Sequence, residues 1–201
     1  MIGNLVIFYL LIFACDIHRS LLSQRLWSSF FPERQIHGLV NLTEKDDIFY
    51  WLFPSRNNMD QDPLIIWLTG GPGCSSELAI FYENGPLKLI DGQPVVNMDS
   101  WNNHANLLFI DQPIGTGYSR ADPNDFNKTE EEISASFGLF LEKFYEIFPE
   151  FINRALYLTG ESYAGHYIPY MGSFINTERF RQQGITLNGV AIGNGWVSPS
   201  L

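Results

Sequence analysis

The chain has 201 residues, of which 45% are hydrophobic, so it is long enough to bury the core of one domain. Its formal net charge is −10 and no basic cluster occurs, which argues against a protein that binds nucleic acid. Its histidines, cysteines and carboxylates lack the spacing of metal ligands, so we expect neither a metal ion nor a cofactor.

The first residues contain an unbroken apolar run, residues 5–14. This run is too short to span a bilayer but has the length of a signal-peptide core. We therefore expect a signal peptide over residues 1–15, entry into the secretory pathway and no stable membrane anchor. A buried N-terminal strand or helix is the alternative. Two glycosylation triplets, beginning at Asn41 and Asn127, fit secretion.

The next part of the chain predicts β-strands. Residues 36–43 and 47–53 read as two strands, and the polar turn at residues 44–47 joins them into an antiparallel hairpin. Two buried strands follow at residues 63–68 and 106–111, where short apolar runs are bounded by loop residues.

Helices and strands alternate from there on. The sequence Thr129–Glu132 is similar to a capping box, and apolar residues at helical spacing follow it until Pro149 ends the helix. Residues 187–193 form the last predicted strand. Strands that alternate with helices after an initial hairpin predict an α/β fold, with a mostly parallel sheet covered on both faces.

A glycine-rich loop follows the strand at residues 63–68. Residues 67–76 read Trp-Leu-Thr-Gly-Gly-Pro-Gly-Cys-Ser-Ser. Glycines in such a loop let the backbone approach a reacting carbonyl closely, and α/β-hydrolases take one oxyanion-hole N–H from a loop of this kind. A surface turn is the alternative for the loop alone.

A candidate nucleophile lies in the motif Gly160–Gly165, which reads Gly-Glu-Ser-Tyr-Ala-Gly. The apolar run at residues 155–159 predicts a strand before it, and residues 163–180 predict a helix after it. A serine at such a strand-to-helix turn is a nucleophile elbow, which indicates Ser162. The next N–H, that of Tyr163, would face an oxyanion formed beside the serine.

In chain order, these motifs resemble the serine carboxypeptidases, a family of α/β-hydrolases. The resemblance rests on Phe49–Trp51, Trp67–Ser76, Glu83–Pro86, Ser100–Asn103, Ile110–Pro113, Gly115–Ser119, Gly160–Pro169 and Gly193–Gly195. It implies an α/β-hydrolase-type, mostly parallel sheet with an antiparallel N-terminal hairpin, truncated before the last strands. It also implies that Ser162 is the acylating nucleophile and that the Gly71 and Tyr163 N–H groups form the oxyanion hole.

The resemblance also implies how the substrate is recognised. Glu161 and Glu83 match the family's carboxylate pair, which helps to hold the free C-terminus of a peptide or protein substrate. Two carboxyl groups in contact retain a proton, because both cannot ionise cheaply, and that proton can be donated to the substrate carboxylate. This favours exopeptidase activity at acid pH, in a lysosome or vacuole or outside the cell. Trp67 matches the same site, and Thr69 replaces a common Asn with a shorter hydroxyl donor.

The rest of the catalytic triad is expected further along the chain. In α/β-hydrolases the acid and the histidine base follow the nucleophile, and the resemblance places both beyond residue 201. His166 matches a family position that is not the base. We therefore expect residues 16–201 to be the N-terminal part of the hydrolase domain, inactive alone, with the partner of Cys74 also beyond its end.

Two other functions stay open. An acyltransferase or esterase uses the same acyl-enzyme, and a non-catalytic binding protein can keep the same fold. The Glu161 and Glu83 pair favours the peptidase, because these groups suit a terminal carboxylate. A homodimer is compatible with the sequence.

Overall fold

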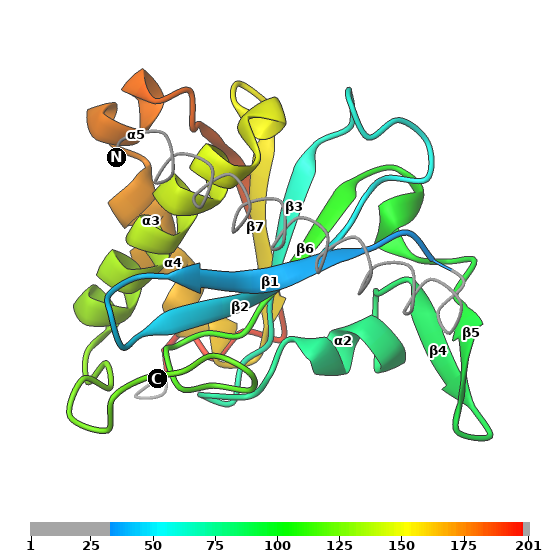
Figure 1. Ribbon diagram of the computed structural model, residues 1–201, viewed down its shortest axis with the longest axis horizontal. Coiled ribbons are helices and arrows are strands. Elements are labelled where there is room, and N and C mark those ends of the chain that lie inside the picture. Colours follow the sequence, from blue (N-terminus) through cyan, green and yellow to red (C-terminus); the bar gives the residue numbers. More distant parts are fainter. Residues whose placement is uncertain (1–32, 199–201) are drawn as a thin grey trace, which may run out of the picture.

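The computed structural model describes residues 33–198, so the signal peptide expected over residues 1–15 lies outside the described part (Figure 1). The strands are β1 (Ile36–Asn41), β2 (Asp47–Phe53), β3 (Leu64–Leu68), β4 (Leu87–Ile90), β5 (Gln93–Val96), β6 (Asn106–Ile110), β7 (Leu156–Glu161) and β8 (Leu187–Gly193). The helices are α2 (Glu77–Tyr82), α3 (Glu130–Ile147), α4 (Ala164–Ile175) and α5 (Glu178–Gln182), with single 3₁₀ turns at Trp101–Asn103 and Pro149–Phe151.

Six strands form one mixed sheet in the order β1-β2-β6-β3-β7-β8. The pairs β1–β2 and β2–β6 are antiparallel, whereas β6, β3, β7 and β8 are parallel to one another. The predicted N-terminal hairpin and mostly parallel sheet are therefore confirmed. Because parallel strands end at the same edge, the loops after β3, β6, β7 and β8 gather there.

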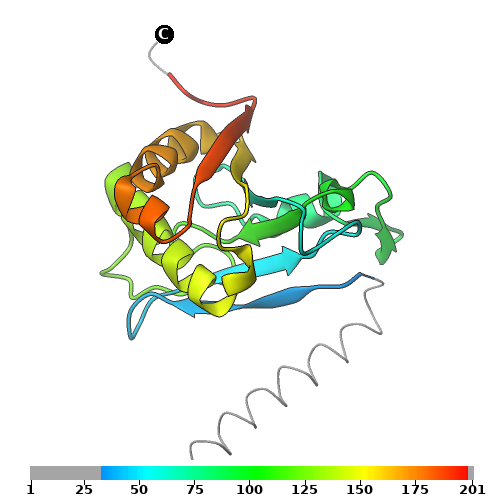
Figure 2. The same cartoon turned by 90° about the horizontal axis from the view of Figure 1, so that it is seen from above.

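The two faces of the sheet bury different cores. Side chains alternate between the faces of a strand, so Tyr50 and Leu52 point to one side and Trp51 and Phe53 to the other. The first face packs under α3 and α4, and the second packs under α2. Figures 1 and 2 show α3, α4 and α5 grouped together, away from α2.

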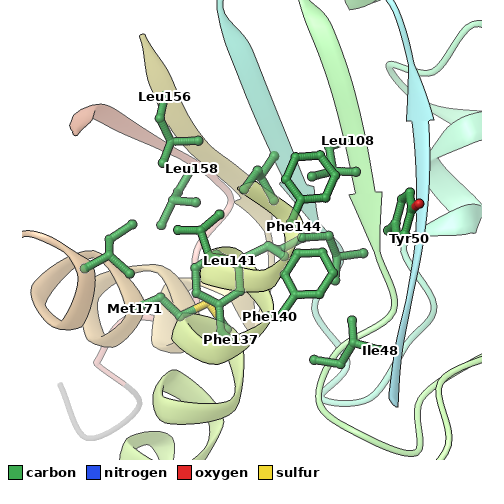
Figure 3. Packing of buried hydrophobic residues seen from close by; sticks show 14 of the residues in the cluster. Ile48, Tyr50, Leu108, Phe137, Phe140, Leu141, Phe144, Leu156, Leu158 and Met171 are labelled. Atoms are coloured by element: carbon green, nitrogen blue, oxygen red, sulfur yellow. The ribbon is translucent and has the colours of Figure 1, made fainter. Parts of the chain in front are cut away.

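Helix α3 supplies the aromatic centre of the larger core. Its N-cap is Thr129, whose hydroxyl oxygen accepts a hydrogen bond from the Glu132 N–H at 3.2 Å, as the capping motif predicts. The buried rings of Phe137, Phe140 and Phe144 face the sheet (Figure 3). The ring centroids of Phe140 and Phe144 are 5.8 Å apart, so the rings pack in direct contact.

The structure corrects one helix. The stretch predicted as one helix over residues 163–180 divides into α4 and α5, because the backbone is extended at Thr177. The break turns α5 back toward α3, and Phe180 becomes buried beside Phe174 and Gly138. Burial of one aromatic side chain favours this break over a continuous helix.

The sequence did not predict α2 or the β4–β5 hairpin. Both lie between the glycine-rich loop and β6, on the side away from α3 and α4 (Figure 1). Helix α2 lies between the glycine-rich loop and Glu83, so it sets the distance between the two. Over residues 33–198, no helix combines the length and the apolarity needed to cross a bilayer.

Candidate active site

Ser162 lies at the turn between β7 and α4, as predicted. Its backbone is left-handed, with a φ of 58°, and its side chain is exposed. The Ser162 N–H donates to the carbonyl of Gly193 at 3.0 Å, and the Ser162 carbonyl accepts from the N–H of Trp196 at 2.8 Å. These bonds join the turn to the end of β8 and to the residues just after it, and they hold the backbone of Ser162 in place.

Small residues allow this turn to pack. A β-carbon on Gly165 would lie 2.8 Å from the Trp196 nitrogen, so glycine is required there. A β-carbon on Gly160 would lie 2.8 Å from the β-carbon of the fully buried Ala164. Alanine therefore fits the place where the strict elbow pattern has glycine, because Gly160 provides the space.

The glycine-rich loop lies beside the elbow. A β-carbon on Gly70 would lie 2.8 Å from the Glu161 carbonyl oxygen and would also clash with the Tyr163 nitrogen. The next residue, Gly71, has a φ of 112°, in a region that L-residues avoid. Tyr167, on α4, accepts a hydrogen bond from the Gly73 N–H at 3.2 Å and ties the loop to the elbow helix.

The Gly71 and Tyr163 N–H groups have suitable surroundings for an oxyanion hole. Within residues 33–198, neither group donates in the hydrogen bonds of turns, loops and caps. Tyr163 precedes the first residue of α4, so its N–H belongs to the positive end of the helix dipole. Gly71 lines the same cavity as Ser162.

This cavity has a volume of about 640 Å³. It brings together four of the residues singled out by the sequence: Ser162, Gly71, Glu161 and Thr69. The remaining walls come mainly from the loop and from α2, including Glu77, Leu78 and Phe81. The Tyr163 side chain lines a separate cavity of about 620 Å³ on the other side of the loop.

Glu83 is not among the described residues that line the cavity, but its carboxyl group contacts that of Glu161, which does. Burial, the charge of Glu161 and a hydrogen bond with Glu161 together raise the pKa of Glu83 to about 7. One oxygen of Glu83, Oε2, is buried and has no hydrogen-bond partner within the described residues. The two carboxyl groups therefore form a pair that keeps a proton at acid pH.

Trp67 and Thr69 form a second pair at the cavity. The Trp67 indole N–H donates to the Thr69 hydroxyl oxygen at 3.1 Å, and both side chains are buried. This bond occupies an acceptor position of the hydroxyl and leaves its proton free to point elsewhere. The Trp67 ring is held in turn by the edge-on ring of Trp101 at a centroid distance of 5.4 Å.

Asp111 holds the end of the glycine-rich loop through hydrogen bonds, a role that was not predicted from the sequence. It is 1% exposed and accepts hydrogen bonds from the Ser75 hydroxyl at 2.6 Å, the Ser76 N–H at 3.1 Å and the Tyr118 N–H at 2.9 Å. Burial raises its pKa, and these three bonds offset part of the rise. An acidic residue at the end of a buried strand was the available signal.

Within the described part of the chain, the His166 ring makes no hydrogen bond to the Ser162 hydroxyl. The ring stacks on Tyr163 at 4.7 Å and meets Trp196 edge-on at 5.9 Å. The ring is therefore part of the packing around the elbow, as the sequence motif indicated. No group of three potential metal ligands occurs within residues 33–198.

Comparison with known proteins decides the family. A family model described as serine carboxypeptidase matches residues 27–201. The chain belongs to the serine carboxypeptidase family. Among curated serine carboxypeptidase relatives, the chain is 45% identical over 173 residues to pheromone-processing carboxypeptidase kex1 of Penicillium rubens, and 46% identical over 158 residues to serine carboxypeptidase 3 of Hordeum vulgare. These alignments cover 82% and 77% of the chain.

A solved structure supports the α/β-hydrolase-type fold of this serine carboxypeptidase chain. The crystal structure of Kex1(delta)p, a prohormone-processing carboxypeptidase from Saccharomyces cerevisiae, superposes with a TM-score of 0.74 and 38% sequence identity. The match covers 83% of the present chain and 40% of that protein. The chain likewise spans only 28% of the Penicillium relative and 31% of the Hordeum relative.

Proposed function

We propose that Ser162 is the acylating nucleophile of a serine carboxypeptidase that removes the C-terminal residue of peptides and proteins. The observation that carries this proposal is the hydrogen-bonded pair of Glu83 and Glu161. Glu161 directly precedes Ser162 and lines the same cavity, so a terminal carboxylate held there would present its scissile bond near the hydroxyl.

The chemistry proceeds through an acyl-enzyme. The Ser162 oxygen attacks the carbonyl carbon of the last peptide bond, and the Gly71 and Tyr163 N–H groups stabilise the negative oxygen that forms. The C–N bond then breaks as the leaving nitrogen takes up the proton that the base removed from the serine, which releases the C-terminal amino acid. Water later hydrolyses the acyl ester. We place the base that takes the serine proton outside residues 33–198, as the family resemblance implies, and the ring of His166 packs against Tyr163 and Trp196 instead.

The carboxyl pair selects substrates with a free C-terminus. Below its pKa of about 7, Glu83 holds the proton of the pair, so the pair can donate a hydrogen bond to a carboxylate. Above this pH both groups are negative and repel the substrate. Thr69 adds a hydroxyl donor, which Trp67 holds in place through the indole bond.

The compartment and the partners follow from the same proposal. A pair that works in its protonated form suits an acidic compartment of the secretory pathway, such as a lysosome or vacuole. Asn41 is exposed at the end of β1 and suits glycosylation, whereas the Asn127 amide already donates to the Ser136 hydroxyl at 3.2 Å. Peptide or protein C-termini are the proposed partners.

A comparison of three substrates tests the function. The natural protein that carries this chain is assayed with an N-blocked dipeptide, the same dipeptide as its C-terminal amide, and the corresponding ester without a free carboxylate. We expect the free acid to be hydrolysed with the highest kcat/KM, most strongly below pH about 7. Equal kcat/KM for all three substrates would indicate an esterase or acyltransferase, and no turnover at all would indicate a binding protein.

A further inference from the structure

A smaller cavity shares Glu77 with the cavity that contains Ser162. It has a volume of about 180 Å³ and is lined by His37, Phe49, Trp51, Glu77 and Tyr118. Cavities that take drug-sized ligands measure roughly 300–1,000 Å³, so this one suits a smaller group. None of the sequence motifs assigned to catalysis accounts for it.

The aromatic rings form a curved wall. Phe49 and Trp51 lie on the same face of β2 and meet at an interplanar angle of 80°, with centroids 6.4 Å apart. Tyr118 continues the wall beyond Phe49, at 5.4 Å and 48°. His37, paired with Trp51 across the β1–β2 hairpin, closes the other side at 5.8 Å and 70°. These rings contact one another and line the cavity.

The loop that carries Tyr118 is held in place. The Tyr118 N–H donates to the buried carboxyl group of Asp111 at 2.9 Å, although the Tyr118 side chain is 68% exposed. The ring is thus fixed at its base and open to solvent on its outer side. A ligand from solution can reach the cavity past this ring.

Glu77 supplies the acidic group among the described lining residues. Its Oε1 atom is buried and has no hydrogen-bond partner within residues 33–198. Burial, and secondarily the charge of Asp111, raise the pKa of Glu77 to about 7. Burial lowers the pKa of His37, so the imidazole is neutral at neutral pH and does not offset the carboxylate.

A carboxyl group beside aromatic rings, with no positive side chain among the described lining residues, suits a positively charged ligand. The faces of tryptophan, tyrosine and phenylalanine rings attract cations through their quadrupoles, most strongly when the cation is partly desolvated. A carboxylate beside these rings adds direct charge attraction. The described lining residues include neither lysine nor arginine that could neutralise Glu77.

We propose that this cavity binds a small organic cation, a quaternary ammonium group, between the rings of Phe49, Trp51 and Tyr118 and the carboxylate of Glu77. The site is separate from the proposed peptidase chemistry, since Glu77 lies on α2 and has no part in the acylation steps. Because Glu77 also lines the larger cavity, an occupied cation site would adjoin the proposed substrate site.

A pair of matched ligands tests the proposal. Choline and its uncharged carbon isostere, 3,3-dimethyl-1-butanol, are titrated into the full natural protein at about pH 8, above the Glu77 pKa of about 7, so that this carboxyl group is ionised. Binding is followed by ligand-observed NMR. We expect choline to bind about tenfold more tightly than the isostere, because only choline carries the positive charge. Equal affinities would overturn the proposal and leave an apolar cavity.

Variants distinguish the contribution of the Glu77 charge to choline binding from that of the aromatic rings. Glu77→Gln keeps the shape and should weaken choline binding by about tenfold while leaving the isostere unchanged. Tyr118→Leu, at an exposed ring, should weaken choline more than the isostere. Glu131→Gln, at an exposed carboxylate on α3, is the matched control and should change neither affinity. Unaltered choline binding by a folded Glu77→Gln protein would refute the site.

Discussion

Gly70 and Ser162 pack so closely that a β-carbon on Gly70 would lie 2.9 Å from the β-carbon of Ser162. This contact sets the glycine-rich loop directly against the elbow. The positions of Ser162 and of the loop N–H groups are therefore coupled by a residue without a side chain. This coupling is a steric contact, because Gly70 has no side chain that could form a hydrogen bond.

Gly70→Ala should disrupt this junction. The new methyl group would meet the Glu161 carbonyl oxygen at 2.8 Å as well as the Ser162 β-carbon, and neither backbone segment is free to move. We expect the free energy of unfolding to fall by about 2–4 kcal/mol in urea titrations. Gly172→Ala on α4 is the control, since its β-carbon would make an ordinary 3.4 Å contact with Leu187 and favours the helix. Equal losses for the two variants would contradict the close packing at Gly70.

Ser162→Ala should remove peptidase activity and leave the fold intact. The hydroxyl is exposed and makes no hydrogen bond that holds the turn within the described residues, so thermal unfolding should be unchanged. Loss of the nucleophile should lower kcat by about four orders of magnitude or more. Steady-state hydrolysis of an N-blocked dipeptide measures this, and a variant with substantial remaining turnover would exclude Ser162 as the nucleophile.

The carboxyl pair should make KM depend on pH. For a free-acid dipeptide, KM should rise as the pH passes about 7, because the pair then loses its proton. The rise should approach about tenfold per pH unit. Replacing both Glu83 and Glu161 by glutamine removes the titrating group and should give a flat KM profile. The C-terminal amide of the same dipeptide is the control substrate, with no pH dependence of KM in either protein.

The same pair should make the fold less stable at high pH. The folded-state pKa of Glu83, about 7, lies above its ordinary value of 4.5, so the folded protein binds this proton more tightly than the unfolded chain. The resulting stabilisation is complete below pH 4.5 and is lost as the pH rises through about 7. Glu83→Gln should therefore reduce the fall in unfolding free energy over this range by about 1–2 kcal/mol. An unchanged pH profile in denaturant titrations would argue against the raised pKa.

Phe144→Ala should be among the most destabilising core changes. The ring is fully buried and contacts the rings of Tyr50, Phe140 and Phe148. We expect a loss of about 3–5 kcal/mol in unfolding free energy, because the cavity cannot collapse between so many rings. Ile147→Ala on the same helix removes a side chain that is 51% exposed and should change stability by less than about 1 kcal/mol.

Much of the sheet could be predicted from the sequence. The strands at Leu64–Leu68 and Asn106–Ile110 are short apolar runs between loop residues, and such runs have few alternatives in an α/β chain. The elbow could be predicted because its glycines and its serine occupy fixed places between a strand and a helix. The approach of Glu83 to Glu161, by contrast, was expected only from the family resemblance, because α2, the helix that leads to Glu83, is too short for a periodic pattern.

Other features depend on tertiary contacts. The break after α4 follows from the burial of Phe180 against α3. Local helix propensity cannot predict such a tertiary contact. The three hydrogen bonds to Asp111 come from two loops that are distant in sequence, so the sequence showed only an acid at the end of a strand. The cavity beside Glu77 likewise forms only when α2 packs under the hairpin.

The left-handed backbone of Ser162, with a φ of 58°, has a consequence for evolution. A residue with a β-carbon in this conformation costs about 1 kcal/mol relative to glycine, so glycine would make the chain more stable. Selection for stability alone would therefore favour an inert protein at this position. Under the proposed function, the serine at this position marks a trade-off between stability and activity that is confined to a single backbone angle.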